Sequence, residues 1–267
     1  MTNEAQLAPW DGELYAANTG HHRAHDASFL QNFPVRPGDR VLDVGCGSGD
    51  FTAAVAGLVP DGEVIGVDPQ PSLLEVARRT ARSNQRFVEA RAQDLDRALP
   101  DGEGFDEVFT RAVLQWVPAA DWPAILRSAF RLLKPGGWLR IECGGAGNIP
   151  HIVPFISEIS AAHGGPPAPW TFLDPGVVME LVEEAGFVLG GDGFVRSVAQ
   201  RRPFTRETLT GWFRSQCYQG FEVAMDPAVH EAFRAEVEGR LDELRRWDGS
   251  FDITYVRDDA LVYRPPA

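Results

Sequence analysis

The sequence predicts an α/β fold in which a largely parallel sheet is flanked by helices. Two observations in the first half of the 267 residues predict it. Short apolar segments alternate with amphipathic segments of helical period, and the gaps between them are short, which is the pattern of strands joined by helical crossovers. A glycine-rich loop separates the first apolar segment from the first helical one, so the backbone can pass close beneath a ligand there.

Five strands are predicted in this half: Arg40–Val44, Val64–Val67, Arg86–Glu89, Glu107–Thr110 and Trp138–Glu142. Between them, apolar residues recur at helical spacing, which predicts one buried face for each helix. These faces are Phe51, Ala54, Val55 and Leu58 in the first helix, Leu73, Leu74 and Ala77 after Pro71 in the second, and Ile125, Leu126, Ala129, Phe130 and Leu133 in the third. Asp121 is expected to cap the third helix, and Pro135-Gly136-Gly137 to end it.

The second half is less regular and predicts a helical insertion before two final strands. His163–Pro169 is rich in glycine and proline and predicts a loop. Asp174 opens a helix that ends at Gly186, and Asp226 opens a longer one. The final strands are expected at Phe187–Val198 and Ile253–Tyr263.

Composition excludes several classes of partner. The formal net charge of −13 at pH 7 repels phosphate backbones and anionic membrane faces. Cys46, Cys143 and Cys217 are far apart and fit neither a paired disulfide framework nor a metal knuckle. Met1–Pro9 has no feature of a signal peptide, and no stretch approaches the roughly 18 apolar residues of a membrane span. We therefore expect a cytoplasmic protein that binds neither nucleic acid nor membrane nor metal.

The most informative local pattern is Val41–Gly49, VLDVGCGSG, together with an acid at the end of the next strand. Asp68 lies 19 residues after this loop, where a carboxylate can accept both hydroxyls of an adenosine ribose. Asp50 stands where the dinucleotide fingerprint GxGxxG requires its third glycine. Asp43, at the mouth of the loop, suits a cationic ligand that carries an amino acid and would repel a pyrophosphate.

This loop, Asp68, Phe105-Asp106 and Leu133–Gly137 together resemble the class I S-adenosylmethionine-dependent methyltransferases, over about Trp10 to Glu142. The resemblance implies an enzyme with a Rossmann-like, doubly wound, seven-stranded sheet whose last strand is antiparallel, and a helical insertion or cap in the C-terminal half. It also implies one methyltransferase domain: residues 1–35 form a helical lid, 36–145 the cofactor-binding core, 146–250 the cap with strand six, and 251–267 the final strand.

The resemblance further implies which residues bind S-adenosylmethionine. Its methionine end would be lined by Asp43, Gly45, Cys46 and Gly47, and its ribose held by Asp68 with Pro69 beside it. The adenine contact stays open among Ala92, Gln93 and Asp94, because Arg91 stands where many relatives carry an acid.

Five more segments resemble the trans-aconitate methyltransferase-like branch: residues 10–15 (WDGELY), 114–118 (LQWVP), 144–149 (GGAGNI), 169–172 (PWTF) and 184–187 (EAGF). Members of this branch methylate varied small acids and natural products. The resemblance therefore implies a small-molecule acceptor and a role in secondary metabolism, and leaves the identity of that molecule open.

A base is needed for methyl transfer only where the acceptor must lose a proton. A carboxylate acceptor needs a cation instead, and Arg111, just past the fourth strand, is the candidate; a surface ion pair is the other interpretation of this residue. The candidate catalytic residues are Arg111, His22 and Tyr15, with Arg111 also near the cofactor. Further acceptor contacts are expected from Tyr15, His21, His25, Gln115, Trp116, Glu142, His151 and Trp170.

We expect methylation of a carboxylic acid oxygen, with N- or C-methylation of an aromatic intermediate as the alternative. For that alternative, His21, His22 and His25 are the nearest bases, since histidine titrates near neutral pH. The alternatives from other classes are an NAD-dependent dehydrogenase, against which Asp50 argues, and a cofactor-binding protein without activity. The sequence leaves both a monomer and a homo-oligomer open.

Overall fold

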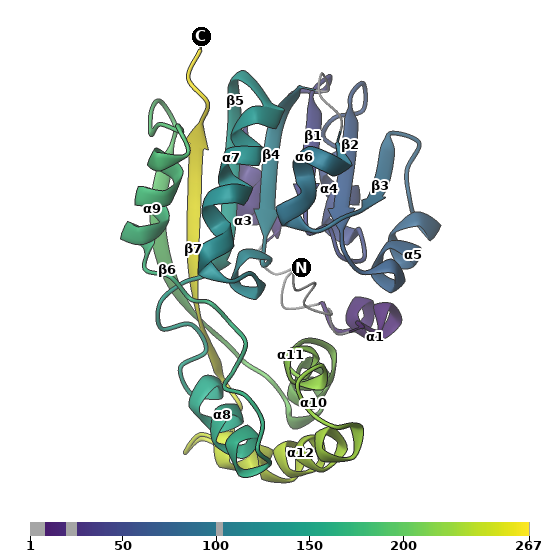
Figure 1. The fold of residues 1–267 in the computed structure, drawn as a ribbon, viewed down its shortest axis with the longest axis vertical. Coiled ribbons are helices and arrows are strands. Elements are labelled where there is room, and N and C mark those ends of the chain that lie inside the picture. Colours follow the sequence, from purple (N-terminus) through teal and green to yellow (C-terminus); the bar gives the residue numbers. More distant parts are fainter. Residues whose placement is uncertain (1–8, 20–25, 100–103, 267) are drawn as a thin grey trace, which may run out of the picture.

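The computed structural model describes residues 9–19, 26–99 and 104–266. A seven-stranded sheet of order β3-β2-β1-β4-β5-β7-β6 forms its upper part in the view of Figure 1. β7 runs antiparallel to both of its neighbours, and β1 to β5 are parallel. The expected seven-stranded sheet with an antiparallel last strand is therefore confirmed. The strands are β1 (Arg40–Val44), β2 (Glu63–Asp68), β3 (Gln85–Glu89), β4 (Phe105–Arg111), β5 (Leu133–Gly144), β6 (Phe194–Arg202) and β7 (Ile253–Tyr263).

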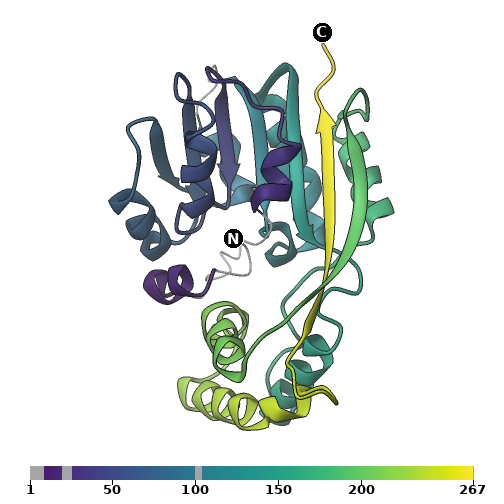
Figure 2. The same ribbon diagram turned by 180° about the vertical axis from the view of Figure 1, so that it is seen from behind.

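Helices cover both faces of the sheet, which is why β1 and β2 are almost continuously apolar and buried (Figures 1 and 2). One face carries α3 (Asp26–Gln31) and α4 (Asp50–Ala56), and the other carries α6 (Leu95–Ala98), α7 (Trp122–Leu132) and α9 (Pro175–Glu184). α5 (Pro71–Arg79) packs beside β3. Ile125, a predicted inward residue of α7, and Val182 of α9 lie in the core between helices and sheet.

Below the carboxyl edge of the sheet lies a helical cap (Figure 1). It consists of α8 (Ile152–Ala162), α10 (Arg206–Gln216), α11 (Gln219–Glu222), α12 (Pro227–Arg240) and the short η4 (Leu241–Leu244). A second apolar core holds these helices together, with Phe213, Phe221 and Phe233 fully buried. β6 and β7 extend beyond the sheet and join it to the cap (Figure 2).

The short helix α1 (Gly12–Ala17) lies between the sheet and the cap (Figure 1). Asp11 caps it by accepting a hydrogen bond from the Leu14 amide. α1 packs so closely on α5 that a Cβ atom at Gly12 would lie 2.4 Å from the Ser72 carbonyl oxygen. On the cap side, Gln216 of α10 donates a hydrogen bond to the Asn18 carbonyl, 3.2 Å away. The described N-terminal segment therefore connects the two parts.

Three short 3₁₀ turns follow the strand ends: η1 (Ala92–Asp94), η2 (Leu114–Trp116) and η3 (Ala119–Asp121). Asp121 does occupy the N-cap position of α7, but its carboxylate accepts a hydrogen bond from Gln93 at 3.0 Å and caps no backbone amide. Among the helices of the described residues, none combines the length and apolar character that crossing a bilayer requires.

The largest departures from the predicted boundaries are at the starts of β5 and β6. α7 ends at Leu132, and β5 starts at the next residue because Leu133 pairs with Phe105, so Pro135-Gly136-Gly137 lies within β5. β6 starts at Phe194, seven residues later than expected, because Gly190 and Gly193 form a turn before it. Val188, in the region predicted as strand, makes only one bridge to β7.

Candidate active site

A cavity of about 290 Å³ lies where the carboxyl ends of the strands face α1 and the cap. Residues of the glycine loop, Asp68 and Arg257 of β7 line it from the sheet, and Trp212 and Gln219 line it from the cap. The carboxyl edge of a parallel sheet is where α/β proteins bind ligands. One end of the cavity therefore lies at the glycine loop, where the sequence predicts cofactor binding. The other end is lined by residues from the less regular second half of the chain.

The glycine loop has a backbone that only glycine adopts easily. Gly45, Gly47 and Gly49 have φ values of +83°, +54° and +79°. The Gly45 amide donates to the Val67 carbonyl at 2.7 Å, which ties the loop to β2. A Cβ atom at Gly45 would lie 2.1 Å from Cγ2 of Val113. The loop thus passes through a space that has no room for a side chain.

Asp68 ends β2 and orders the loop through both carboxylate oxygens. Oδ2 accepts a hydrogen bond from the Gly47 amide and Oδ1 one from the Gln70 amide, each at 2.9 Å. Burial raises the pKa of Asp68 to about 6, against these two hydrogen bonds, which lower it. Each oxygen keeps further lone pairs, so this buried carboxylate, with Pro69 beside it in the cavity lining, fits the hydroxyls of a ribose.

Asp43 lies in an adjoining side pocket of about 60 Å³ instead of in the main cavity. Cys46 lines the same side pocket, and Tyr15, Gly45 and Arg111 line both. Burial raises the pKa of Asp43 to about 7, although the Thr52 hydroxyl donates a hydrogen bond to it at 2.6 Å. A buried acid of this kind is stabilised by an incoming cation, which fits the ammonium group of an amino acid.

Aromatic rings form one wall of the cavity. We call Trp10, Trp116, Trp170 and Phe172 the aromatic wall; all four line the cavity. Trp116 makes edge-to-face contacts with Trp10 at 5.3 Å and with Trp170 at 5.7 Å between ring centroids. Trp170 stacks on Phe172 with an interplanar angle of 16°. Such a row buries a flat apolar body well.

Arg111 is held in a largely buried charged cluster, which we define as Asp26, Arg111, Glu142 and Arg257; the Asp26 side chain is the most exposed of the four, at 29%. Arg111 donates from Nη1 to Asp26 at 2.6 Å and from Nε to Glu142 at 3.2 Å, and its side chain is 7% exposed. Arg257 donates from Nη1 to the same Glu142 oxygen at 3.1 Å. Arg111 is therefore an ion-pair partner, as one of the two interpretations of the sequence holds, but a buried one that lines the cavity.

Two non-glycine residues of the described chain have positive φ, and both line the cavity. Ala112, with φ of 57°, follows Arg111, and its amide donates to the Glu142 carbonyl at 2.7 Å. Ile149, with φ of 43°, ends the segment after β5. Backbone strain of this kind persists where the surrounding structure enforces it, commonly at functional sites.

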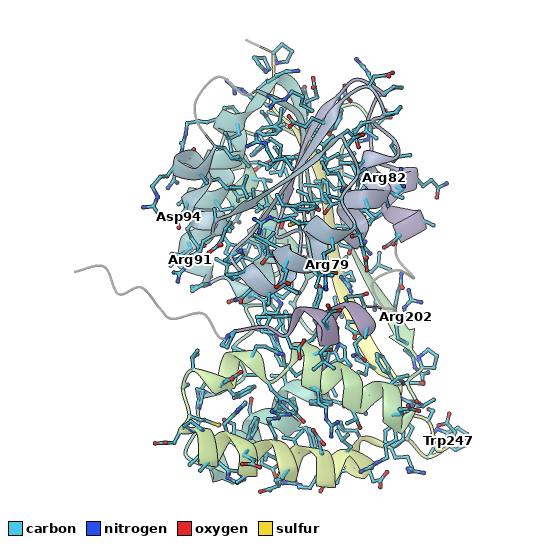
Figure 3. The ribbon with its side chains drawn as sticks, turned by 90° about the vertical axis from the view of Figure 1, so that its right-hand side faces the viewer. Arg79, Arg82, Arg91, Asp94, Arg202 and Trp247 are labelled. Atoms are coloured by element: carbon cyan, nitrogen blue, oxygen red, sulfur yellow. The ribbon has the colours of Figure 1, made fainter. Side chains whose placement is uncertain are left out.

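The other predicted residues differ in where the structure places them. Gln115, Trp116, Trp170 and Tyr15 line the cavity, and Glu142 lies directly behind it as the partner of both arginines. Ala92, Gln93 and Asp94 do not line the cavity. Asp94 pairs with Arg97 at 2.9 Å, and Figure 3 shows Arg91 and Asp94 at the left margin of the molecule. His151 is exposed and lines a separate hollow of the cap instead of the main cavity. His21, His22 and His25 lie outside the described residues.

Sequence reasoning missed Trp10, Asn148, Gln219 and Arg257 as cavity residues. One signal could have identified the last of them. Arg257-Asp258-Asp259 interrupts the otherwise apolar strand Ile253–Tyr263 with three charges. Charged residues are seldom buried without a partner, so a charged run inside a buried strand indicates a site or an ion-pair network.

Several known proteins are similar to this chain. Residues 41–137 match the family described as a methyltransferase domain. A trans-aconitate 2-methyltransferase of Methylobacterium radiotolerans is 35% identical over 51% of this chain and 50% of its own length, so the match spans about half of that relative. Another from Rhodococcus jostii is 28% identical over 93% of this chain and 96% of its own. A demethylmenaquinone methyltransferase of Symbiobacterium thermophilum is 30% identical over 67% of this chain and 80% of its own.

Solved structures share the fold at low sequence identity. YcgJ of Bacillus subtilis superposes with a TM-score of 0.62 and 17% identity, covering 92% of this chain and 100% of that one. Phosphoethanolamine N-methyltransferase 2 of Haemonchus contortus, in complex with phosphomonomethylethanolamine and S-adenosylhomocysteine, gives 0.59 and 18%, covering 95% and 57%.

Proposed function

Because this chain belongs to the class I S-adenosylmethionine-dependent methyltransferases, on the trans-aconitate methyltransferase-like branch, we propose that its acceptor is a small acid and that a carboxylate oxygen receives the methyl group. The observation that carries this proposal is the single cavity that joins the glycine loop to an aromatic wall and two buried arginines. The proposed unit is one methyltransferase domain over residues 1–267, acting in the cytoplasm and in secondary metabolism, without nucleic acid or membrane partners.

The residues present fit the cofactor. Asp43 would accept the ammonium group of its methionine end, Asp68 the ribose hydroxyls, and the loop from Gly45 to Gly47 would lie beneath it. Tyr15 covers the loop, since Cε1 of its ring lies 3.3 Å from the position of a Cβ atom on Gly47. When bound, the cofactor supplies an electrophilic methyl group on a sulfonium sulfur.

The acceptor end supports a reaction without a general base. Burial, with the Asp68 carboxylate next, raises the pKa of Tyr15, so this phenol stays protonated and does not serve as a base. A carboxylate is ionised at neutral pH and needs no base. The chain's contribution is then to orient the acceptor and exclude water from the cavity.

The direct test incubates the protein with isotopically labelled S-adenosylmethionine and a panel of small acids, and identifies the products by mass spectrometry. We expect a methyl ester, recognised by release of labelled methanol in alkali. At saturating cofactor, kcat is expected to stay flat from pH 8 down to about pH 5. A steep limb near pH 6–7 that disappears in a His21, His22 or His25 variant would instead establish N- or C-methylation.

Cofactor binding is expected to release protons and to weaken as the pH falls. Asp43 and Asp68 have pKa values raised to about 7 and about 6, and both must be ionised to hold the cationic ligand. A group with pKa near 7 that must lose its proton makes the Kd for S-adenosylmethionine roughly tenfold higher at pH 6 than at pH 8. Calorimetry in two buffers of different protonation enthalpy measures both effects. Equal Kd values with no proton release would contradict the assignment of these acids.

A further inference from the structure

We infer that the acceptor is a monocarboxylic acid with a flat, largely apolar body, and that Arg257 binds its carboxylate. This inference rests on the proposed carboxylate methylation and names the substrate class and the residue that recognises it. It departs from the acid named in the relatives' titles, since trans-aconitate carries three carboxylates. The argument starts from the hydrogen bonds of Arg257 and then turns to the charges and rings around the cavity.

Arg257 is a buried cation with an unused donor. It lies on β7, is 6% exposed and lines the cavity. Its Nε is buried and has no hydrogen-bond partner among the described residues. A buried charged donor without a partner is costly, and because the Arg257 side chain lines the cavity, a ligand bound there can supply the missing acceptor to the guanidinium group. The fork of a guanidinium matches a carboxylate in particular.

The charged cluster also leaves Arg257 less compensated than Arg111. A single Glu142 oxygen accepts from both guanidinium groups, at 3.2 Å from Arg111 Nε and 3.1 Å from Arg257 Nη1. Arg111 has a second carboxylate, Asp26, at 2.6 Å. The salt bridges of Arg257 among the described residues reach only Glu142. An incoming carboxylate is therefore attracted more strongly to Arg257 than to Arg111.

The rest of the cavity suits an apolar body and a single negative charge. The aromatic wall and Trp212 supply its apolar surface. Among the described residues, Arg111 and Arg257 are the two cations that line it, and Arg111 already has two carboxylates. The second and third carboxylates of a tricarboxylic acid would be desolvated against rings and neutral amide side chains without a further cation, which is unfavourable.

The reaction on this acceptor is balanced without a proton transfer. One carboxylate oxygen forms the new bond to the methyl carbon as the carbon–sulfur bond breaks, and the electron pair of that bond stays on sulfur. The acceptor loses its negative charge when it becomes an ester. Its ion pair with Arg257 is then lost, which favours release of the product.

The test measures binding in the presence of S-adenosylhomocysteine, by quenching of tryptophan fluorescence. The probes are 3-phenylpropanoate, its amide 3-phenylpropanamide, and trans-aconitate. We expect the unchanged protein to bind the monocarboxylate at least about tenfold more tightly than either of the others. Arg257→Gln is expected to reduce its affinity to that of the amide. Arg201→Gln, on the exposed part of β6, is the matched control and should change nothing.

Affinity for S-adenosylhomocysteine, measured separately, shows whether each variant keeps its fold. If Arg257→Gln no longer binds S-adenosylhomocysteine, Arg257→Lys is used in its place, because it retains the charge without the guanidinium fork. This variant is expected to lower the ratio of acid to amide affinity. Three outcomes would each overturn the inference. The first is a ratio of acid to amide affinity that stays unchanged in the folded Arg257 variant. The others are equal binding of acid and amide by the unchanged protein, and tighter binding of trans-aconitate than of 3-phenylpropanoate. Tight binding through Arg257 without ester formation would leave this recognition in place and refute the proposed reaction.

Discussion

Replacing Gly45 by alanine is expected to destabilise the protein by roughly 2–5 kcal/mol and to remove most of its cofactor binding. A non-glycine residue at the φ of +83° costs about 1–2 kcal/mol. The added methyl group would also lie 2.1 Å from Val113, and overpacking of this kind costs about 1–3 kcal/mol. Either Val113 or the loop must shift to relieve the contact, and a shift of the loop moves the surface on which the cofactor is proposed to lie. Urea unfolding and calorimetry with S-adenosylhomocysteine measure the two effects.

The chain offers a matched control for this substitution. Gly136 has nearly the same φ, +85°, but a Cβ atom there would meet nothing within 4 Å. Gly136→Ala is therefore expected to cost about 1–2 kcal/mol of stability and to leave cofactor affinity unchanged. Adding Val113→Ala to Gly45→Ala should restore part of the lost affinity, because the two nearest atoms are removed. Equal losses in both glycine variants would show that strain alone, and not the crowded loop, is responsible.

Replacing Asp68 by alanine is expected to weaken S-adenosylhomocysteine binding by roughly 1.5–3 kcal/mol, which is about ten- to a hundredfold. The substitution removes the carboxylate proposed to accept the ribose hydroxyls. It also releases the amides of Gly47 and Gln70, each of which donates to Asp68 at 2.9 Å. Isothermal titration calorimetry at pH 8 measures the change where the carboxylate is ionised.

Asp106 provides the comparison for Asp68. It is a strand acid at the opposite edge of the sheet, where it pairs with Lys134 at 2.8 Å and accepts from the Arg40 amide. Asp106→Ala is expected to keep cofactor affinity within about twofold, whatever its modest effect on stability. Unchanged affinity in Asp68→Ala would remove the ribose assignment, and an equal loss in both variants would point to a general loosening of the sheet.

The sequence predicted those parts of the fold in which local pattern and tertiary packing agree. β1 and β7 have the expected bounds, and for β1 the reason is that an apolar segment covered on both faces leaves little choice of where a strand begins and ends. β5 differs, since its first residue is fixed by pairing with Phe105, a partner that no local pattern reveals. The cap helices α8 and α10 were expected only as an unspecified helical insertion.

In the candidate site, too, contacts set by local spacing could be predicted from the sequence and contacts between distant segments could not. The glycine loop and Asp68 belong to one strand–loop–helix unit and its neighbouring strand, so their meeting follows from short-range spacing. The charged cluster joins residues whose hydrogen-bonded pairs are 31 to 115 positions apart along the chain, and spacing carries no information about such contacts. Arg257 therefore escaped prediction, although Glu142 and Arg111 were both among the candidates.

The separation of the cap's apolar core from those of the sheet bears on how this enzyme can change over evolutionary time. The two cores packed against the sheet share no residue with the core of the cap, and β6 and β7 connect the parts. Mutations inside the cap can therefore reshape the acceptor end while the packing beneath the glycine loop is retained. A lineage with this architecture can exchange one acceptor for another by drift in the cap, and keep the same methyl donor throughout.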